Sequence, residues 1–257
     1  MKILSNELDI YRNLKNSLEL VTKVPISQQN IFQDLFFKNF QYSRAQILQD
    51  VFVLAVLGSK ENGYFVEAGA SDGLDCSNTY LLEKKFGWNG LLIEPSKMSF
   101  ESIQTNRSAN ALNLALFSTS GLSMQFRETT SLGLSSLADF SNNDYMSGER
   151  INQQLYQVET ITLQDALNKA HAPTMIDFLS LDTEGSEFEI LKNFDFNTYE
   201  ISVICCEHNY SEQRDFIYQL LVKNGFNRVL TEISGYDDWY INTEIQDKCR
   251  NRGLNFD

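Results

Sequence analysis

The sequence predicts an α/β fold in which helices cover both faces of a doubly wound, mainly parallel β-sheet. From residue 63 onward, short apolar strands alternate with amphipathic helices, which is typical of βαβ units. A glycine-containing turn follows the first of these strands, as in sheets that bind ligands at their carboxyl edge. The last two predicted strands, 226–233 and 239–242, are close in sequence and predict an antiparallel hairpin at the end of the sheet.

Length and composition predict one large domain with an appendage. The 257 residues can bury a single sizeable core, and 42% hydrophobic residues are enough to form it. Residues 1–43 are expected to form an N-terminal helical appendage that Pro25 interrupts, and residues 44–257 the main domain.

The charge and the cysteines exclude several kinds of partner. A formal charge of -13 would repel a phosphate backbone, so no nucleic-acid partner is expected. The cysteines match no zinc spacing and are expected to be reduced, mostly buried thiols. The first ten residues carry two acids without a long apolar core, and no segment has the roughly 20 apolar residues of a membrane span. The prediction is a cytoplasmic protein without a membrane span.

The first half of the main domain has a recognisable order of elements. A helix over 44–57 carries apolar residues on one face and ends at Gly58. Apolar runs predict strands at 63–67 and 90–94, and amphipathic stretches predict helices at 77–86 and 96–107. A strand at 109–116 is expected to turn at 118–121 into a return strand at 122–127. Residues 128–149, rich in Ser, Asn and Gly, are expected to form a long loop.

The second half continues the alternation. Thr162 and Asp165 form a predicted capping pair for a helix to about residue 169. A strand at 176–182 follows, and the nearly continuous apolar run at 201–206 predicts a central strand buried on both faces. A helix at 212–223 ends at an Asn-Gly stop signal before the terminal hairpin.

The turn after the first strand, residues 67–73, is the first candidate site. Gly69 and Gly73 allow backbone conformations and close approaches that a side chain would block. Glu67 and Asp72 would repel a pyrophosphate, whereas they suit a ligand with an ammonium or sulfonium charge. The turn also departs from the G-x-G-x-x-G pattern of dinucleotide-binding folds. A tight turn with helix-capping acids would explain the same residues without any ligand.

Two other strands end in acidic residues. Glu94 ends the strand at 90–94, and an acid at this distance from the glycine turn typically binds the ribose hydroxyls of an adenosine ligand. Pro95 then stops the strand. Asp182 ends the strand at 176–182 and Glu184 lies two residues further on. Both are expected to face the same crevice, although Glu184 would also suit a helix cap.

Taken in order, these residues resemble the FkbM-type methyltransferases, class I enzymes that move a methyl group from S-adenosylmethionine, often to a hydroxyl oxygen. The resemblance covers about residues 45–242. It rests on Gln49-Asp50, Phe65-Val-Glu-Ala-Gly-Ala-Ser-Asp-Gly73, Ser77-Asn-Thr-Tyr80, Gly87-Trp-Asn-Gly-Leu-Leu-Ile-Glu-Pro95, Leu181-Asp-Thr-Glu-Gly185 and Glu207-His-Asn209. It implies the class I methyltransferase (Rossmann-like) fold, with a seven-stranded, mainly parallel sheet that ends in an antiparallel hairpin.

The resemblance also implies a cofactor site for S-adenosylmethionine. Its expected residues are Glu67, Gly69, Ser71, Asp72 and Gly73 around the methionine portion, Ser77, Asn78 and Thr79 on the carboxylate side, Glu94 and Pro95 at the ribose, Asn113, Ala115 and Leu116 at the adenine edge, and Asp182 beside the reactive methyl. Aspartate is also common in the family at the position of Glu67, and the charge is the same.

The chemistry of an alcohol acceptor needs a base, because the hydroxyl must lose its proton. We expect His208 or Asp182 to accept it, with Glu207 or Asn209 orienting the groups. A divalent metal held by Asp182, Glu207 and His208 is a less favoured alternative.

The acceptor is expected to be a small molecule or glycan, with methylation of a hydroxyl on a saccharide or other small natural product. Its pocket would be built from residues 128–149 and the N-terminal helices. Two other functions stay open. One is an NAD-type nucleotide-dependent oxidoreductase, which the acidic turn disfavours, and the other is a catalytically silent cofactor-binding domain of the same fold.

Overall fold

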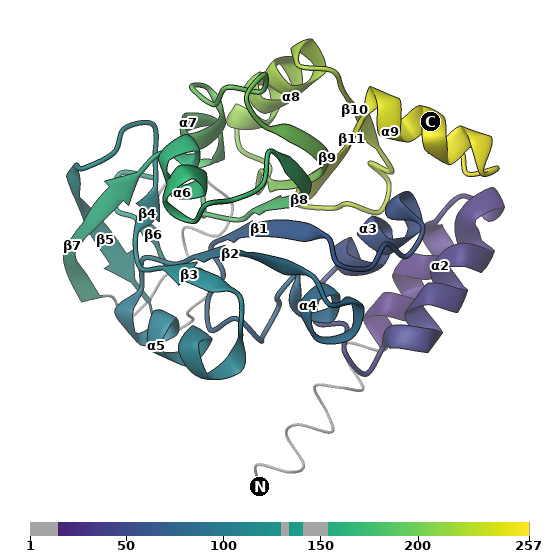
Figure 1. Cartoon of the computed structure of the whole chain (residues 1–257), viewed down its shortest axis with the longest axis horizontal. Helices are drawn as coiled ribbons and strands as arrows, with labels where there is room; N and C mark the ends of the chain where they lie inside the picture. Colours follow the sequence, from purple (N-terminus) through teal and green to yellow (C-terminus); the bar gives the residue numbers. More distant parts are fainter. Residues whose placement is uncertain (1–14, 130–133, 141–153, 257) are drawn as a thin grey trace, which may run out of the picture.

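The structure is a computed structural model that describes residues 15–129, 134–140 and 154–256. Figure 1 shows a central sheet with helices packed on both of its faces and a smaller sheet at one end. No helix in these ranges is long and apolar enough to cross a membrane.

The main sheet has seven strands. In spatial order they are β10 (Phe226–Val229), β11 (Asp237–Asn242), β9 (Glu200–Glu207), β8 (Met175–Leu181), β1 (Tyr64–Ala68), β2 (Asn89–Ile93) and β3 (Asn110–Leu112). The strands from β9 to β3 pair in parallel, while β11 pairs antiparallel with both β9 and β10. The predicted doubly wound sheet and its terminal hairpin are therefore confirmed. The strand order reverses at β1 and β8, which is where such sheets bind ligands.

Alternating side chains of the strands build two apolar cores. Phe65 of β1 packs in the core that α2 (Ile26–Asn39), α3 (Gln49–Leu57) and α4 (Tyr80–Phe86) share. The next residue, Val66, faces the opposite core, which includes α6 (Leu163–Lys169), α7 (Glu187–Leu191) and α8 (Gln213–Lys223). Because successive residues of a strand point to opposite faces, one short apolar run fills both cores.

The N-terminal helices differ from the prediction at one boundary. Residues 15–23 are helical, and α2 begins directly after Pro25. The helix predicted over 44–57 begins only at Gln49, because Leu48 adopts a left-handed conformation with φ 72° that breaks the helix before it. The expected end at Gly58 is confirmed, and its backbone N–H donates to the carbonyl of Leu54.

The hairpin predicted over 109–127 is wrong. This segment contains β3, a separate strand β4 (Ala115–Leu116) and β5 (Ser123–Glu128). The last two belong to a second sheet of order β4-β7-β5-β6, completed by β6 (Ser136–Leu137) and β7 (Gln154–Ile161). β5 pairs with β6 and β7 rather than with the preceding strand, because Phe126 and Leu137 bury their side chains in a small core of this sheet.

The expected loop at 128–149 lies partly outside the described residues. Within the described part, residues 136–137 form β6 instead of loop. β7 is a strand that the sequence did not predict. The predicted helix cap is confirmed, because the Thr162 hydroxyl accepts a hydrogen bond from the backbone N–H of Asp165 at the start of α6.

The C-terminal segment contains two further differences. β10 stops at Val229 rather than at residue 233, because Leu230 has a left-handed φ of 53° that turns the chain out of the strand. An unpredicted helix, α9 (Thr243–Asn251), then packs against α3. The Cys249 thiol donates to the carbonyl of Val56, and Phe256 is fully buried beside Phe52. α5 (Lys97–Asn106) lies between β2 and β3, as predicted.

Candidate functional site

A cavity of about 650 Å³ lies at the carboxyl ends of the central strands of the main sheet. The predicted site residues that line it are Glu67, Gly69, Ser71, Asp72, Ser77, Asn78, Glu94, Pro95, Ala115, Leu116, Asp182, Glu184, Glu207 and Asn209. The structure therefore brings most of the predicted residues of four strand ends to one space. Gly73, Thr79, Asn113 and His208 are not among its lining residues.

Gly69 fixes the contact between the turn after β1 and the end of β8. It has a φ of 76°, and a Cβ atom there would lie 1.7 Å from the carbonyl oxygen of Asp182. The backbone N–H of Asp182 in turn donates to the carbonyl of Ala68. Only glycine allows these two loops to approach so closely, so the turn after β1 and Asp182 hold each other in place.

The Glu67 carboxylate organises the segment before α4. It accepts hydrogen bonds from the Ser77 hydroxyl at 2.9 Å, the Asn78 backbone N–H at 2.6 Å and the Thr79 hydroxyl at 2.6 Å. Because these donors satisfy the buried carboxylate, Glu67 positions the 77–79 segment at the edge of the cavity. Thr79 is thus a support for Glu67 rather than a wall of the cavity.

Arg107, at the end of α5, completes this support, and no sequence pattern singled it out. Its fully buried guanidinium lies 3.4 Å from Glu67 Oε2 and donates to Glu83 Oε2 at 2.7 Å and to the Thr79 hydroxyl at 2.8 Å. It also donates to the carbonyl of Gly73, which explains why that glycine stands behind the cavity wall. The planar, multiply donating guanidinium suits such a network.

Glu94 at the end of β2 holds the turn with its own carboxylate. Its two oxygens accept the backbone N–H groups of Ser71 and Ser96, each at 2.8 Å. Burial raises the pKa of Glu94 to about 7, despite these hydrogen bonds. Asn113 lies behind it and donates to the carbonyl of Glu94 at 2.8 Å, so Asn113 supports the strand end without lining the cavity.

The second sheet supplies a wall whose strands the sequence did not predict, although residues 128–149 were expected to build the acceptor pocket, and Leu134, Ser135 and Leu137 of that range line the cavity. Phe126 of β5 and Leu137 of β6 line the cavity opposite the strand ends, together with Leu134. The Ser96 hydroxyl donates a hydrogen bond to the Glu128 carboxylate, which also accepts one from the Tyr156 hydroxyl at 3.0 Å. These side chains link the second sheet to the residues that follow β2. The alternating apolar residues of 123–137 are the only sequence signal for this wall.

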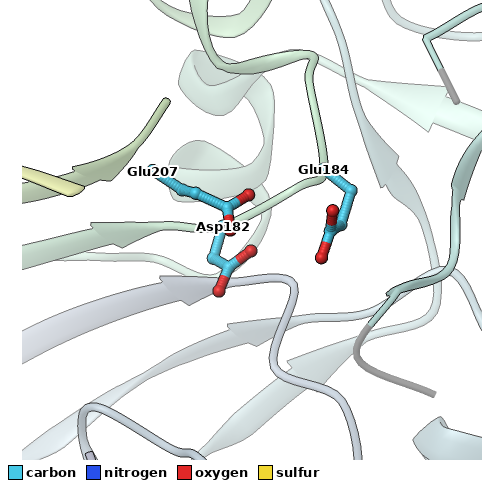
Figure 2. A group of neighbouring side chains, drawn as sticks. All are labelled: Asp182, Glu184 and Glu207. Atoms are coloured by element: carbon cyan, nitrogen blue, oxygen red, sulfur yellow. The ribbon is translucent and has the colours of Figure 1, made fainter. Parts of the chain in front are cut away.

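Three carboxylates gather at the ends of β8 and β9 (Figure 2). Asp182 follows β8, Glu184 lies two residues further, and Glu207 is the last residue of β9. One oxygen from each lies within 4.8 Å of the others. The Asn209 amide donates to Glu184 at 3.3 Å.

Proximity and burial change the protonation of this group. Burial, with the Asp237 charge next in importance, raises the pKa of Asp182 to about 8. Burial and the neighbouring Asp182 charge raise the pKa of Glu207 well above its ordinary value. Two buried carboxylates this close cannot both stay ionised without a proton or a cation between them.

His208 is directed away from the cavity. Its Nδ1 accepts the backbone N–H of Tyr210 at 3.0 Å, and its Nε2 lies 3.7 Å from Asp238. Burial lowers the pKa of His208 to about 4. The structure therefore places Glu184, not His208, beside Asp182 and Glu207. Left-handed backbone conformations at Asn209 and Tyr210 produce this turn, and the sequence alone does not reveal them.

Other lining residues were not predicted. Tyr236 lines the cavity and donates its hydroxyl to Gln46, another lining residue, at 3.1 Å. Gln49, which the resemblance included without a role, donates to the buried Asp237 at 2.9 Å. The four cysteines are free thiols as expected, and three are buried, whereas Cys76 is exposed and lines the cavity. Partial burial of the thiol within the cavity, together with the neighbouring Asp75 and Asp182 charges, raises the pKa of Cys76 to about 11.

Solved structures with a similar architecture include several methyltransferases. A methyltransferase FkbM from Methylobacillus flagellatus KT is 12% identical, with a TM-score of 0.46, and the match covers 91% of this chain and 60% of that protein. A precorrin-6y C5,15-methyltransferase from Geobacter metallireducens GS-15 is 10% identical over 75% of this chain and 85% of that one, with a TM-score of 0.40. The N-terminal domain of human METTL16, solved in complex with SAH, is 13% identical over 76% and 68%, with a TM-score of 0.39.

The family comparison covers the site itself. No curated protein matches the chain significantly. The model of the methyltransferase FkbM domain matches residues 67–234, from Glu67 in β1 to the segment before β11. This range is more than half of the 257 residues. The chain therefore belongs to the FkbM methyltransferase family.

Proposed function

We propose that this protein transfers a methyl group from S-adenosylmethionine to a hydroxyl oxygen of a saccharide or other small natural product. The observation that carries the proposal is that Glu94 and Asp182, at the ends of β2 and β8, flank the Gly69 turn on one cavity. This is the point of the sheet where the strand order reverses.

The donor groups of the cavity fit this cofactor. The side-chain oxygen of Asn78 is buried and has no hydrogen-bond partner in the described part of the chain, so it can accept a bond from an ammonium group. Asp72, Glu94 and Asp182 line the same cavity, and a bound cation would favour the ionised forms of such acids. A pyrophosphate would be repelled by each of these acids that is ionised.

The two ends of the cavity differ in polarity. Ile93, Ala115 and Leu116 from the main sheet and its edge, with Phe126 and Leu137 of the second sheet, give an apolar surface suited to a flat adenine ring. Glu94 lies between this surface and the acidic end and would accept hydrogen bonds from ribose hydroxyls. When bound, the cofactor's sulfonium supplies an electrophilic methyl group.

Asp182 is the residue that we propose accepts the proton of the acceptor hydroxyl. Its carboxylate lines the cavity, and the contact between its backbone and Gly69 fixes it relative to the cofactor turn. Glu207 lies beside it and keeps it oriented. His208 is the weaker candidate, because its side chain is 1% exposed and its Nε2 is directed at Asp238. Alignment of the acceptor by these walls would supply much of the rate.

Calorimetric titration of the whole chain with S-adenosylmethionine, with SAH and with NAD tests the cofactor. We expect the first two ligands to bind and NAD not to bind. Binding of NAD alone would replace the proposal with a nucleotide-dependent oxidoreductase. Mass spectrometry of cell glycans and small metabolites, with and without the active protein, then identifies the acceptor as the compound that gains one CH₂ unit.

Asp182→Asn and His208→Asn decide between the two bases once the acceptor is known. We expect Asp182→Asn to lower kcat by about 10²-fold or more while the affinity for S-adenosylmethionine changes little. His208→Asn should have a much smaller effect on kcat. A larger loss for His208→Asn would assign the base to the histidine, and full activity of Asp182→Asn would remove the proposed role of Asp182.

A further inference from the structure

The carboxylates of Asp182, Glu184 and Glu207 are arranged like the ligands of a metal ion rather than like separate acids on the protein surface. One oxygen of each residue lies within 4.8 Å of the other two, and all three residues line the cavity. Figure 2 shows the three side chains converging from the end of β8, the loop after it and the end of β9. Asp182 and Glu207 are therefore positioned by the ends of adjacent parallel strands, and Glu184 by the loop after β8.

An independent observation comes from the far oxygen of Glu207. Its Oε2 is fully buried and has no hydrogen-bond partner in the described part of the chain, in a residue that is only 6% exposed. Figure 2 shows the Glu207 carboxylate directed toward Asp182. Within the described ranges, no Lys or Arg forms an ion pair with Asp182 or Glu207. A buried, ionised carboxylate oxygen without a donor is costly, so this point favours either a proton shared with Asp182 or a bound cation.

We infer that Asp182, Glu184 and Glu207 bind one divalent cation of the magnesium and manganese class. All three donors are carboxylate oxygens, which such hard cations prefer over soft metals. With metal–oxygen bonds of about 2.1 Å, neighbouring ligands of such an ion lie roughly 3 Å apart and opposite ligands roughly 4 Å apart. The oxygens lie within 4.8 Å of one another, so the side chains would move closer together when the ion binds.

The position of the ion gives it a role in the reaction. Three protein carboxylates leave coordination positions that face the cavity, where an oxygen of the acceptor can bind. The ion would orient that hydroxyl and lower its pKa, and Asp182 keeps a second oxygen to accept the proton. This role rests on the proposed methyl transfer, whereas the binding of the ion does not.

The test uses the full chain after dialysis against a chelator, with Mn²⁺ as the probe. Electron paramagnetic resonance counts the free Mn²⁺ during a titration, and thermal denaturation is followed with and without the ion. We expect one Mn²⁺ per chain, displaced by Mg²⁺, with a rise in Tm. Glu184→Gln and Glu207→Gln should each weaken Mn²⁺ binding at least about tenfold and abolish that rise.

Glu212→Gln is the matched control, because it makes the same change at an exposed residue outside the cavity. It should bind Mn²⁺ as the unchanged chain does. The Tm of each variant without metal shows that it is folded. Absence of Mn²⁺ binding at millimolar concentration, or unchanged binding by both cluster variants, would mean that the acids only share a proton. Binding of S-adenosylmethionine measured in the presence of a chelator separates the cation site from the proposed methyl transfer. It tests the cofactor site when no metal ion is available.

Discussion

Glu94 combines two tasks that normally oppose each other. Its ionised form is the better hydrogen-bond acceptor, and both oxygens already hold backbone N–H groups of the surrounding segments. Burial nevertheless raises its pKa to about 7, so near neutral pH a fraction of the molecules has a protonated Glu94. The hydrogen bonds of Glu94 to Ser71 and Ser96 should therefore strengthen as the pH rises through about 7.

The affinity for S-adenosylmethionine should consequently increase as the pH rises through about 7. Glu94 is protonated below this pH and ionised above it, and the ionised carboxylate accepts ribose hydroxyls more strongly. We expect a gain of about tenfold between pH 6 and pH 8, measured by calorimetric titration. Glu94→Gln should bind more weakly and lack this part of the pH dependence. The same pH profile in both proteins would contradict the assignment.

Replacing Gly69 by alanine, with Gly121 as the comparison, distinguishes the cost of a positive φ from the cost of a steric collision. Gly69→Ala adds a Cβ atom 1.7 Å from the Asp182 carbonyl oxygen at φ 76°, whereas Gly121→Ala adds one at φ 78° with no atom within 4 Å. We expect Gly121→Ala to cost about 1 kcal/mol in the free energy of unfolding. Gly69→Ala should cost about 2 kcal/mol more, because the two loops must move apart. Urea denaturation measures both, and equal costs would refute the close contact.

At the scale of whole elements, α9 and the residues that follow it pack against α3 and form hydrogen bonds with its C-terminal end. Arg252 and the Cys249 thiol both donate to the carbonyl of Val56, near the end of α3. Phe256 packs its ring edge against Phe52, with ring centroids 6.0 Å apart. The segment after β11 is thus part of the apolar core beneath the sheet.

Phe256→Ala should therefore destabilise the protein although it lies next to the chain end. The side chain is fully buried, so its loss leaves a cavity and should cost about 3 kcal/mol. Phe216→Ala is the control, because Phe216 on α8 is 54% exposed and should cost less than about 1 kcal/mol. Chemical denaturation gives both values. A small effect at Phe256 would mean that the segment does not pack on α3 in solution.

Elements with long apolar runs could be predicted from sequence, and so could the acids at their ends. Glu94 and Asp182 follow strands that are buried on both faces, so their positions at the ends of apolar runs were enough to predict that they face the cavity. The second sheet could not be predicted in this way, because β4 has two residues and its Ala115 pairs with Thr160, far along the chain. α9 was missed because Ile245 and Cys249 are its only apolar residues. The orientation of His208 depends on a turn with two left-handed residues that follow it.

For the molecule as a whole, buried acids set the pH dependence of stability. Burial raises the pKa of Asp50 to about 6 from 3.8 and that of Glu94 to about 7 from 4.5. The folded chain then keeps a proton that the unfolded chain has already released. Each acid therefore contributes its full stabilisation at a pH below its pKa in the unfolded chain. This contribution is lost as the pH rises through its pKa in the folded chain. His208, with its pKa lowered to about 4 from 6.5, acts in the opposite sense, because its contribution is lost as the pH falls.

Asp50→Asn isolates one of these contributions. The variant cannot titrate at this position, so its Tm relative to the unchanged chain should rise between pH 4 and pH 7 and then level off. We expect a relative gain of about 5 °C across this range, measured by thermal denaturation in matched buffers. A difference in Tm that does not vary with pH would show that Asp50 is not buried in its charged form at neutral pH.

The order of the lining residues along the chain has a consequence for biosynthesis. The cavity draws on residues from Gln46 to Tyr236, and the wall from the second sheet needs β7, which ends at Ile161. During translation the turn after β1 and Glu94 leave the ribosome before Asp182 and Glu207. The cavity can therefore be completed only after Tyr236, the last of its described lining residues, has been synthesised.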